Sequence, residues 1–285
     1  MQGFIKAVGA GKKRARDLTR EEAREAMIAL LATRDEAQIG AFLLALRMKG
    51  EAAEELAGFC DALGTPAGAS LAALDVDAHA DGHEGRPTLL PAAVMLAKSA
   101  GLDVLLRVDR TAVRGQHNHV AAVADSLGVR TSDLSVEHPA LKRLLDMRAR
   151  VGVRTFVNSL VKLWSPRGAP ARLVGIFHGP YHEPMARALV LIGAFGLVVQ
   201  AQGGLPEPPP DKPCKMTPTG GKTFVFDPRP LGGRSLVLTD SLALNRAALD
   251  DPDSPARTAA RIAAATMLVA AGLARDLSDA FARTT

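Results

Sequence analysis

A cluster of basic side chains at residues 142–154 is the part of the sequence with the clearest chemistry. The segment KRLLDMRARVGVR holds five basic residues and one acid, Asp146. Guanidinium and ammonium groups gathered in this way bind anions, above all phosphates, because they offer positive charge and several N–H donors together. The cluster predicts an anion-binding surface, although a solvated helix face would show the same composition.

The positive charge of the whole chain is concentrated around this cluster. The 285 residues carry a formal net charge of +5, and residues 136–172 alone hold eight Lys/Arg against two Asp/Glu. Residues 61–135 carry six Lys/Arg against nine Asp/Glu, so their acids would have to face away from a bound polyanion. A local patch of one sign attracts an opposite charge even where the total charge is modest.

The basic segment is expected to form one amphipathic helix. At about 100° per residue, positions 143, 150 and 154 fall within about 40° of one another. The opposing apolar side is formed by Leu141, Leu144, Leu145 and Val151. The predicted nucleic-acid contacts on this face are Arg143, Arg150 and Arg154 at the centre, with Lys142, Arg148 and Lys162 beside them. A second cluster, Lys12, Lys13 and Arg14, is either a solvated terminus or a phosphate-contacting arm.

The composition narrows the class of protein. Apolar residues at 47% and charged residues at 23% are typical of a globular protein, while aromatic residues at 4% offer few rings for base stacking. Two distant cysteines, no apolar run of membrane length and no signal peptide indicate a cytoplasmic protein without a membrane partner. No spacing among His79, His83, Asp77 and Asp81 matches a zinc signature, so no metal site is predicted.

Two regions differ in their hydrophobic rhythm. Residues 1–66 show helical spacing, with capping patterns at Thr19/Glu22 and Asp35/Gln38. Residues 67–285 alternate short apolar strands with helices, which predicts an α/β domain with a mostly parallel sheet. The expected strands are 104–108, 173–177, 197–200, 223–226 and 235–238. The expected helices are 90–100, 118–127, 183–192, 255–272 and 276–283. The Pro-rich stretch 203–221 is expected to lack regular structure.

Three stretches resemble the anthranilate phosphoribosyltransferases of glycosyltransferase family 3. They are FLLALRMKGEAAEELAGF (42–59), EHPALKRLLDMRARVGVRTFVNSL (137–160) and SPRGAPARLVGIF (165–177). The resemblance implies a small helical domain joined to an α/β domain, with dimers formed through the helical one. It also implies transfer of a phosphoribosyl group from phosphoribosyl pyrophosphate to anthranilate, with Mg²⁺, and a substrate pocket at His138, Arg154 and Asn158.

The sequence departs from that family where phosphate would bind. The Gly-rich loop after the first strand is replaced by Val76-Asp-Ala-His-Ala-Asp-Gly-His-Glu-Gly85, whose acids would repel phosphate. The second phosphate loop corresponds to residues 111–122, which lack its serine run. Of the acidic pair that binds Mg²⁺ in the family, only Glu207 is left. These departures predict that no residue is catalytic and that no cofactor is bound, Mg²⁺ being expected only for an active enzyme.

The combination resembles the YbiB branch of the family, on the residues GKKRARDLTRE, LALRMKGE and MRARVGVR. This resemblance implies a dimer without transferase activity that binds nucleic acid without sequence preference. The leading hypothesis is therefore a degenerate transferase fold that binds DNA or RNA. The alternatives are a divergent glycosyl- or phosphoribosyltransferase, in which His138, Arg154 and Asn158 hold the acceptor, and a protein-interaction scaffold.

Overall fold

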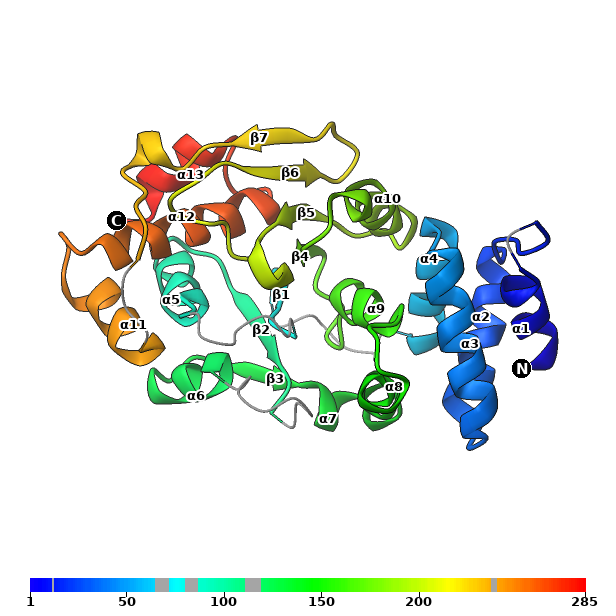
Figure 1. The fold of residues 1–285 in the computed structure, drawn as a ribbon. Helices are drawn as coiled ribbons and strands as arrows, with labels where there is room; N and C mark the ends of the chain where they lie inside the picture. Colours follow the sequence, from blue (N-terminus) through cyan, green and yellow to red (C-terminus); the bar gives the residue numbers. More distant parts are fainter. Residues whose placement is uncertain (12, 65–71, 80–86, 111–118, 237–239) are drawn as a thin grey trace.

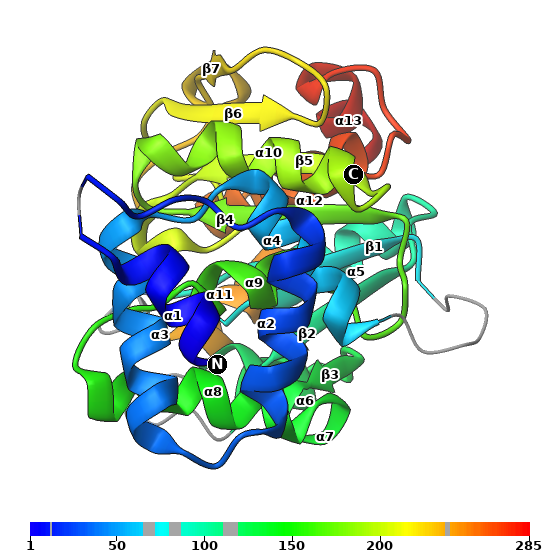
Figure 2. The ribbon, with the colours of Figure 1, turned by 90° about the vertical axis from the view of Figure 1, so that its right-hand side faces the viewer.

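The computed structural model describes residues 1–11, 13–64, 72–79, 87–110, 119–236 and 240–285. Four N-terminal helices pack against one end of a larger α/β part (Figure 1). They cover the side of the α/β part that carries helices α8, α9 and α10 (Figure 2). The four helices are α1 (Gln2–Gly9), α2 (Arg20–Ala32), α3 (Glu36–Lys49) and α4 (Ala53–Leu63). No described helix is both long enough and apolar enough to span a membrane.

The N-terminal helices begin where the capping patterns predict. The Thr19 side chain accepts from the backbone N–H of Glu22, and the Glu22 carboxylate accepts from the backbone N–H of Thr19. Asp35 accepts from the backbone N–H groups of the first turn of α3. These contacts satisfy amide groups that have no partner inside the helix. The predicted helical N-terminal part is confirmed.

The α/β part is built on one sheet of seven strands in the order β3-β2-β1-β4-β5-β6-β7. The strands are β1 (Leu74–Asp77), β2 (Val104–Val108), β3 (Thr131–Asp133), β4 (Ala171–Ile176), β5 (Phe195–Gln200), β6 (Cys214–Pro218) and β7 (Phe224–Phe226). The pairs from β3 to β5 are parallel, and β6 and β7 add antiparallel pairs at one edge. The predicted mostly parallel sheet is confirmed.

Two hydrophobic cores lie on the two faces of the sheet. Leu173 of β4 faces a core that includes helices α5, α6, α11, α12 and α13, while Val174 faces α8, α9, α10 and the N-terminal helices. The second core is therefore continuous between the helical part and the α/β part.

The α-helices beyond Leu63 are α5 (Leu90–Ser99), α6 (His119–Ser126), α7 (Leu134–Glu137), α8 (Pro139–Val151), α9 (Val157–Leu163), α10 (His182–Leu191), α11 (Ser241–Asp250), α12 (Pro255–Ala270) and α13 (Leu277–Arg283). Short 3-10 turns span Gly179–Tyr181 (η1), Gln202–Gly204 (η2) and Arg229–Leu231 (η3).

The structure corrects the predicted course of the Pro-rich stretch and its surroundings. Residues 203–221 were expected to be irregular, yet they contain strand β6, which pairs with β5 and β7. Residues 235 and 236 form no strand, and residues 237–239 lie outside the described part. The predicted domain boundary at residues 66 and 67 also lies outside it and stays a prediction.

Gly58 allows α2 and α4 to approach closely. A Cβ atom at residue 58 would lie 2.1 Å from the backbone oxygen of Arg20 and 2.8 Å from the Cβ atom of Ala23. We expect Gly58→Ala to lower the free energy of unfolding by about 1–3 kcal/mol, the usual cost of overpacking. Gly40→Ala is the control, because its Cβ would meet nothing within 4 Å. In urea unfolding Gly40→Ala should gain about 0.5–1 kcal/mol; equal effects of the two changes would contradict this packing argument.

Candidate anion-binding pocket

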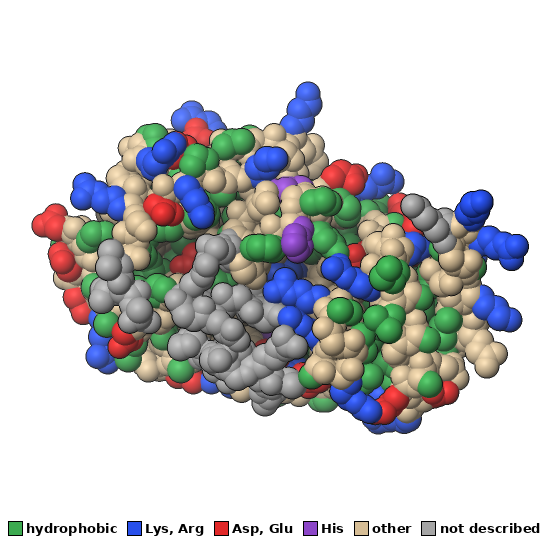
Figure 3. All heavy atoms as spheres, in the orientation of Figure 1, with side chains coloured by type: hydrophobic (Ala, Val, Ile, Leu, Met, Phe, Trp, Pro, Cys, Tyr) green, Lys and Arg blue, Asp and Glu red, His purple; other side chains and the backbone are tan. Residues whose placement is uncertain are grey.

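A pocket opens where the strand order changes direction. From β1 the chain continues outward to β2 and β3, and it returns to place β4 on the other side of β1. In parallel α/β sheets, ligands bind in the crevice outside the carboxyl ends of the strands at such a point. Lys and Arg side chains gather there in a hollow near the middle of the molecule, beside His and apolar side chains (Figure 3).

Three cations from distant parts of the sequence line this interdomain pocket. Arg47 comes from α3, Arg154 from the turn after α8, and Lys162 from α9. The other lining residues are Thr155, Asn158, Ser159, Gly175, Ile176, Phe177, His178, Tyr181, Met185 and Gly204. Together with the open solvent at its mouth, the pocket encloses about 550 Å³ of space.

Lys162 is fixed at the base of the pocket. Its Nζ donates hydrogen bonds to the backbone oxygens of Gly175 at 2.6 Å and Gly204 at 2.5 Å. Burial lowers the pKa of Lys162 to about 8, although attraction to Asp77 opposes this shift. The ammonium is therefore mostly charged at neutral pH. The backbones of β4 and the η2 turn come so close that a Cβ atom at residue 175 would lie 2.1 Å from the carbonyl carbon of Leu205.

Arg47 and Arg154 place two guanidinium groups in the same pocket. Arg47 donates to the Tyr181 hydroxyl at 2.9 Å. Burial lowers the pKa of Arg154, and the charge of Arg47 lowers it further. One acid lies nearby, since Glu51 interacts with Tyr181 and Arg47, and burial raises the pKa of its carboxyl group. Two like charges held this close favour an anion between them, because an anion lowers the cost of their repulsion.

The predicted single arginine face is wrong. Helix α8 ends at Val151, and Gly152 turns the chain with a left-handed backbone (φ 84°). Arg154 therefore lies beyond the helix, where the 100° rule does not apply. Arg143 donates to the backbone oxygens of Leu31 and Thr33 at 2.9 and 3.1 Å, at the C-terminal end of α2. It joins the α/β part to the helical part instead of facing the solvent.

The remaining predicted contacts of α8 also change. Arg150 is exposed but pairs with Glu36 in the first turn of α3. Lys142 is only 5% exposed, pairs with Asp146 and lies 3.7 Å from Asp109, so it cannot reach a phosphate. Arg148 is half-buried, and burial and the charge of Arg154 lower its pKa. Its charge interacts with that of Arg154, although Arg148 itself does not line the pocket.

His138 and Asn158 were predicted to line one substrate pocket, but only Asn158 lines the pocket in the structure. His138 caps α8, since its Nδ1 accepts from the backbone N–H of Leu141 at 3.1 Å, and its ring packs edge-on against Trp164. Burial lowers the pKa of His138, so it is neutral at neutral pH. Asn158 does line the pocket, beside Arg154.

The predicted phosphate-contacting arm, Lys12, Lys13 and Arg14, does not line the pocket in the part that the structure describes. Lys13 and Arg14 are exposed in the turn that follows α1, and α1 lies on the side of the helical part that faces away from the sheet (Figure 1). Lys12 lies outside the described residues. The structure therefore does not bring this cluster together with the cations of the pocket.

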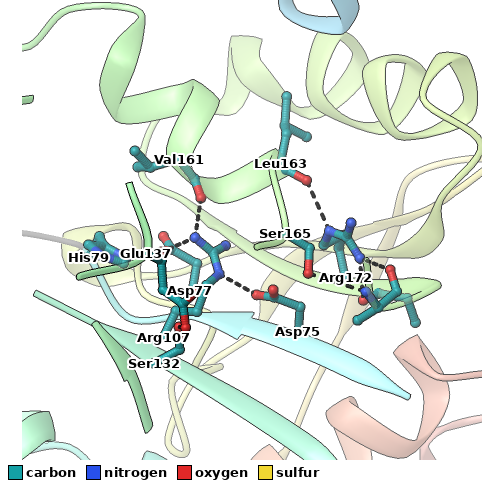
Figure 4. A network of polar contacts seen from close by, with 12 residues as sticks. Asp75, Asp77, His79, Arg107, Ser132, Glu137, Val161, Leu163, Ser165 and Arg172 are labelled. Carbon is teal, nitrogen blue, oxygen red and sulfur yellow. Dashed lines mark hydrogen bonds and ion pairs between the residues drawn. The ribbon is translucent and has the colours of Figure 1, made fainter. Parts of the chain in front are cut away.

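Several acids in the described part of residues 61–135 pair with arginines of the same segment. Buried Arg107 donates to Asp75 at 2.5 Å and to the backbone oxygen of Val161 at 2.6 Å, and it lies 3.5 Å from Asp77 (Figure 4). Burial alone would raise the pKa of Asp77, but attraction to His79 and Arg107 holds it at about 2. On the surface, Arg110 pairs with Asp125 and Arg130 pairs with Asp103. These pairs reduce the repulsion that the segment would exert on a polyanion.

Among the described residues, no group of three or more His, Cys, Asp or Glu side chains is placed so that it could hold a metal ion.

Comparisons with known proteins fit this architecture. Residues 2–64 match the glycosyl transferase family, helical bundle domain. Over 93% of its length the chain is 31% identical to the anthranilate phosphoribosyltransferase of Methylobacterium nodulans, and it covers 88% of that protein. The chain belongs to the anthranilate phosphoribosyltransferase family.

Solved structures of the anthranilate phosphoribosyltransferase family share the fold. The enzyme of Thermus thermophilus superimposes with a TM-score of 0.81 at 27% identity, over the whole of this chain and 93% of that one. The enzyme of Saccharomyces cerevisiae, in complex with PRPP and Mg, superimposes with a TM-score of 0.74 at 16% identity, over 99% and 92% of the two chains. The second likeness shows the fold alone.

Glu207 stands where the sequence places the family's acidic pair. Its carboxylate accepts from the backbone N–H of Leu89 at 2.7 Å and from the Thr88 hydroxyl at 3.1 Å, so it binds the two residues that directly precede α5. Burial raises the pKa of Glu207 to about 7, so it is partly protonated at neutral pH. A Mg²⁺ ligand must be ionised and face the ion. Glu207 therefore does not fit the family's Mg²⁺ site.

Glu207→Gln should change how stability depends on pH. The folded protein holds the Glu207 proton up to about pH 7, whereas the usual pKa of the unfolded chain is 4.5. Between these values the folded state binds more protons, so the free energy of unfolding falls as pH rises. Glutamine keeps the acceptor and cannot ionise. We expect the variant to be more stable than the wild type at pH 8 and similar at pH 4.5 in urea unfolding; a constant difference would contradict this.

Sequence reasoning missed several residues of the pocket. Arg47 lies within the quoted motif LALRMKGE, so the family signature held it, but nothing local indicated that it meets Arg154. Phe177, His178 and Tyr181 gave no signal at all. They follow a strand at its carboxyl end, which is the one general reason to have considered them.

Proposed function

We propose that this member of the anthranilate phosphoribosyltransferase family binds nucleic acid, DNA or RNA, through phosphate contacts and does not transfer a phosphoribosyl group. The observation that carries the proposal is the meeting of Arg47, Arg154 and Lys162 in one open pocket. Arginine and lysine bind phosphate oxygens by charge and hydrogen bonds without reading a base sequence. Binding without sequence preference is what such a pocket would give.

Two further observations support the loss of transfer chemistry. The sequence lacks the glycine-rich and serine-rich phosphate loops of the family, and Glu207 is committed to the start of α5. The likeness to the YbiB branch adds the expectation of nucleic-acid binding. The footprint proposed from the structure is Arg47, Arg154, Lys162 and Arg148, with Arg150 at the margin.

A direct comparison of ligands tests the proposal. The purified chain is titrated with a fluorescent oligonucleotide, and in parallel with phosphoribosyl pyrophosphate and Mg²⁺ by calorimetry. We expect tight, salt-sensitive binding of the oligonucleotide and no transfer to anthranilate. Micromolar binding of phosphoribosyl pyrophosphate with product formation would overturn the proposal.

A divergent transferase is the second candidate. Arg154 and Asn158, two of the three residues that the family resemblance assigns to the acceptor, do lie in one pocket. The same calorimetric experiment decides between the two functions, because only a transferase needs the sugar phosphate.

We also propose a homodimer formed through the helical part. Ile28 of α2 and Leu44 and Met48 of α3 are large apolar side chains exposed on these helices. Exposed apolar groups of this kind are typical of protein interfaces. Light scattering should give twice the mass of the 285-residue chain, and Met48→Glu should shift it toward the monomer.

A further inference from the structure

Phe177 is an exposed aromatic ring between two pockets. It follows directly after the carboxyl end of β4, a central strand of the sheet. Its exposed fraction is 46%, which is high for a large apolar residue at this place. Its ring packs edge-on against the His178 ring, with centroids 4.7 Å apart. Gln200 donates to its backbone oxygen at 3.2 Å, which holds the turn in place. The backbone is therefore held at this turn, and nearly half of the residue stays accessible beside the His178 ring.

The second pocket continues the positive charge beyond this ring. Phe177, Gln200, Lys212 and Lys215 are among the residues that line it. Lys212 and Lys215 are both exposed, and they come from the segment that leads into and forms β6. Phe177 lines this pocket and the interdomain pocket alike. Cations thus stand on both sides of one accessible ring.

This arrangement suits a single strand better than a duplex. Phosphate contacts do not distinguish the two, because both carry the same charged groups. A ring between two pockets contacts a base only when the base has an open face, as in a single strand. Cationic grooves with aromatic rings between them are the recurring way to hold single strands without sequence preference.

We propose that Phe177 stacks on an unpaired base of a single-stranded nucleic acid whose backbone runs from the interdomain pocket to Lys212 and Lys215. The inference rests on the proposed nucleic-acid binding and gives it a substrate preference, single strands over duplexes. It extends the footprint across β4 and β6, beyond the basic segment 142–154.

Fluorescence anisotropy with a 20-nucleotide single strand, and with the duplex of the same sequence, tests the stacking role. Phe177→Ala should weaken binding of the single strand about tenfold or more, the loss expected for one stacked base, and should change duplex binding less than twofold. Phe195→Ala is the matched control, because Phe195 has a similar exposure of 43% and lies at the amino end of β5. Phe177→Tyr keeps a ring and should retain the affinity.

A second variant reports the contact itself. Trp164, the single tryptophan of the chain, is buried, so Phe177→Trp adds an accessible indole. Its fluorescence should be quenched by the single strand and little affected by the duplex. Lys212→Glu with Lys215→Glu should also weaken single-strand binding, whereas Lys222→Glu, outside both pockets, should not.

The outcomes separate the two proposals. Wild-type protein that binds neither oligonucleotide overturns the nucleic-acid function as a whole. Wild-type protein that binds, with Phe177→Ala unchanged or weakened equally for single strand and duplex, overturns only the stacking role.

Discussion

The double variant Arg47→Glu/Arg154→Glu should bind a single-stranded oligonucleotide about 1,000-fold more weakly than the wild type at fixed salt, or weaker still. Both guanidinium groups line the pocket, and burial lowers the pKa of Arg154, which indicates a partly desolvated charge. Loss of such a charge contact costs about 2–5 kcal/mol in binding, and reversal adds repulsion. Anisotropy titration measures the effect.

A matched variant distinguishes the effect of the pocket charges on binding from the effect of the net charge of the protein. Arg229→Glu/Arg275→Glu makes the same change in net charge at two exposed arginines outside the pocket. It should weaken binding only a few-fold. Equal losses of affinity in the two double variants would show that net charge, and not the pocket, determines binding. Arg143 is unsuitable as a test of binding, because it joins α8 to the end of α2.

Arg107→Met should lower the free energy of unfolding by about 3–5 kcal/mol, the usual cost of removing one partner of a buried ion pair. Arg107 is 2% exposed and compensates two carboxylates, Asp75 and Asp77, whose side chains are fully buried. Its bond to the backbone oxygen of Val161 also holds α9, which carries Lys162, against the sheet. Methionine fills the space and leaves both acids without that charge.

Urea unfolding of Arg107→Met beside Arg110→Met checks this prediction. Arg110 pairs with Asp125 on the surface, where a salt bridge contributes about 1 kcal/mol at most. Similar losses in the two variants would show that the Arg107 network contributes little. Adding Asp75→Asn to Arg107→Met should restore part of the stability, because it removes one of the uncompensated charges.

Much of the fold was predictable because its local signals agree. Strand β2 begins and ends at the predicted residues, Val104 and Val108, since an apolar run lies between a glycine turn and a polar turn. The caps at Thr19 and Asp35 fix the starts of α2 and α3. Strand β6 was missed because prolines surround it; its pairing with β5 and β7 outweighs that local bias.

The site was predictable only in part, because residues far apart in the sequence form it. The charge cluster indicated Arg154 and Lys162, yet the assumption of one uninterrupted helix placed Arg154 beside Arg143 and Arg150. Gly152 was the signal against it, since glycine at this place commonly ends a helix. No local pattern could show that Arg47, more than a hundred residues earlier, completes the pocket.

The salt dependence of oligonucleotide binding tests the central claim most directly. Phosphate contacts release counterions, so the logarithm of the affinity should fall linearly with the logarithm of the salt concentration, by about 0.7 per phosphate for a single strand. We expect a steep slope for the wild type, and a slope smaller by about 0.7 for each pocket cation replaced by a neutral residue at Arg47, Arg154 or Lys162. Binding that does not change with salt, or a slope that these replacements leave unchanged, would contradict it.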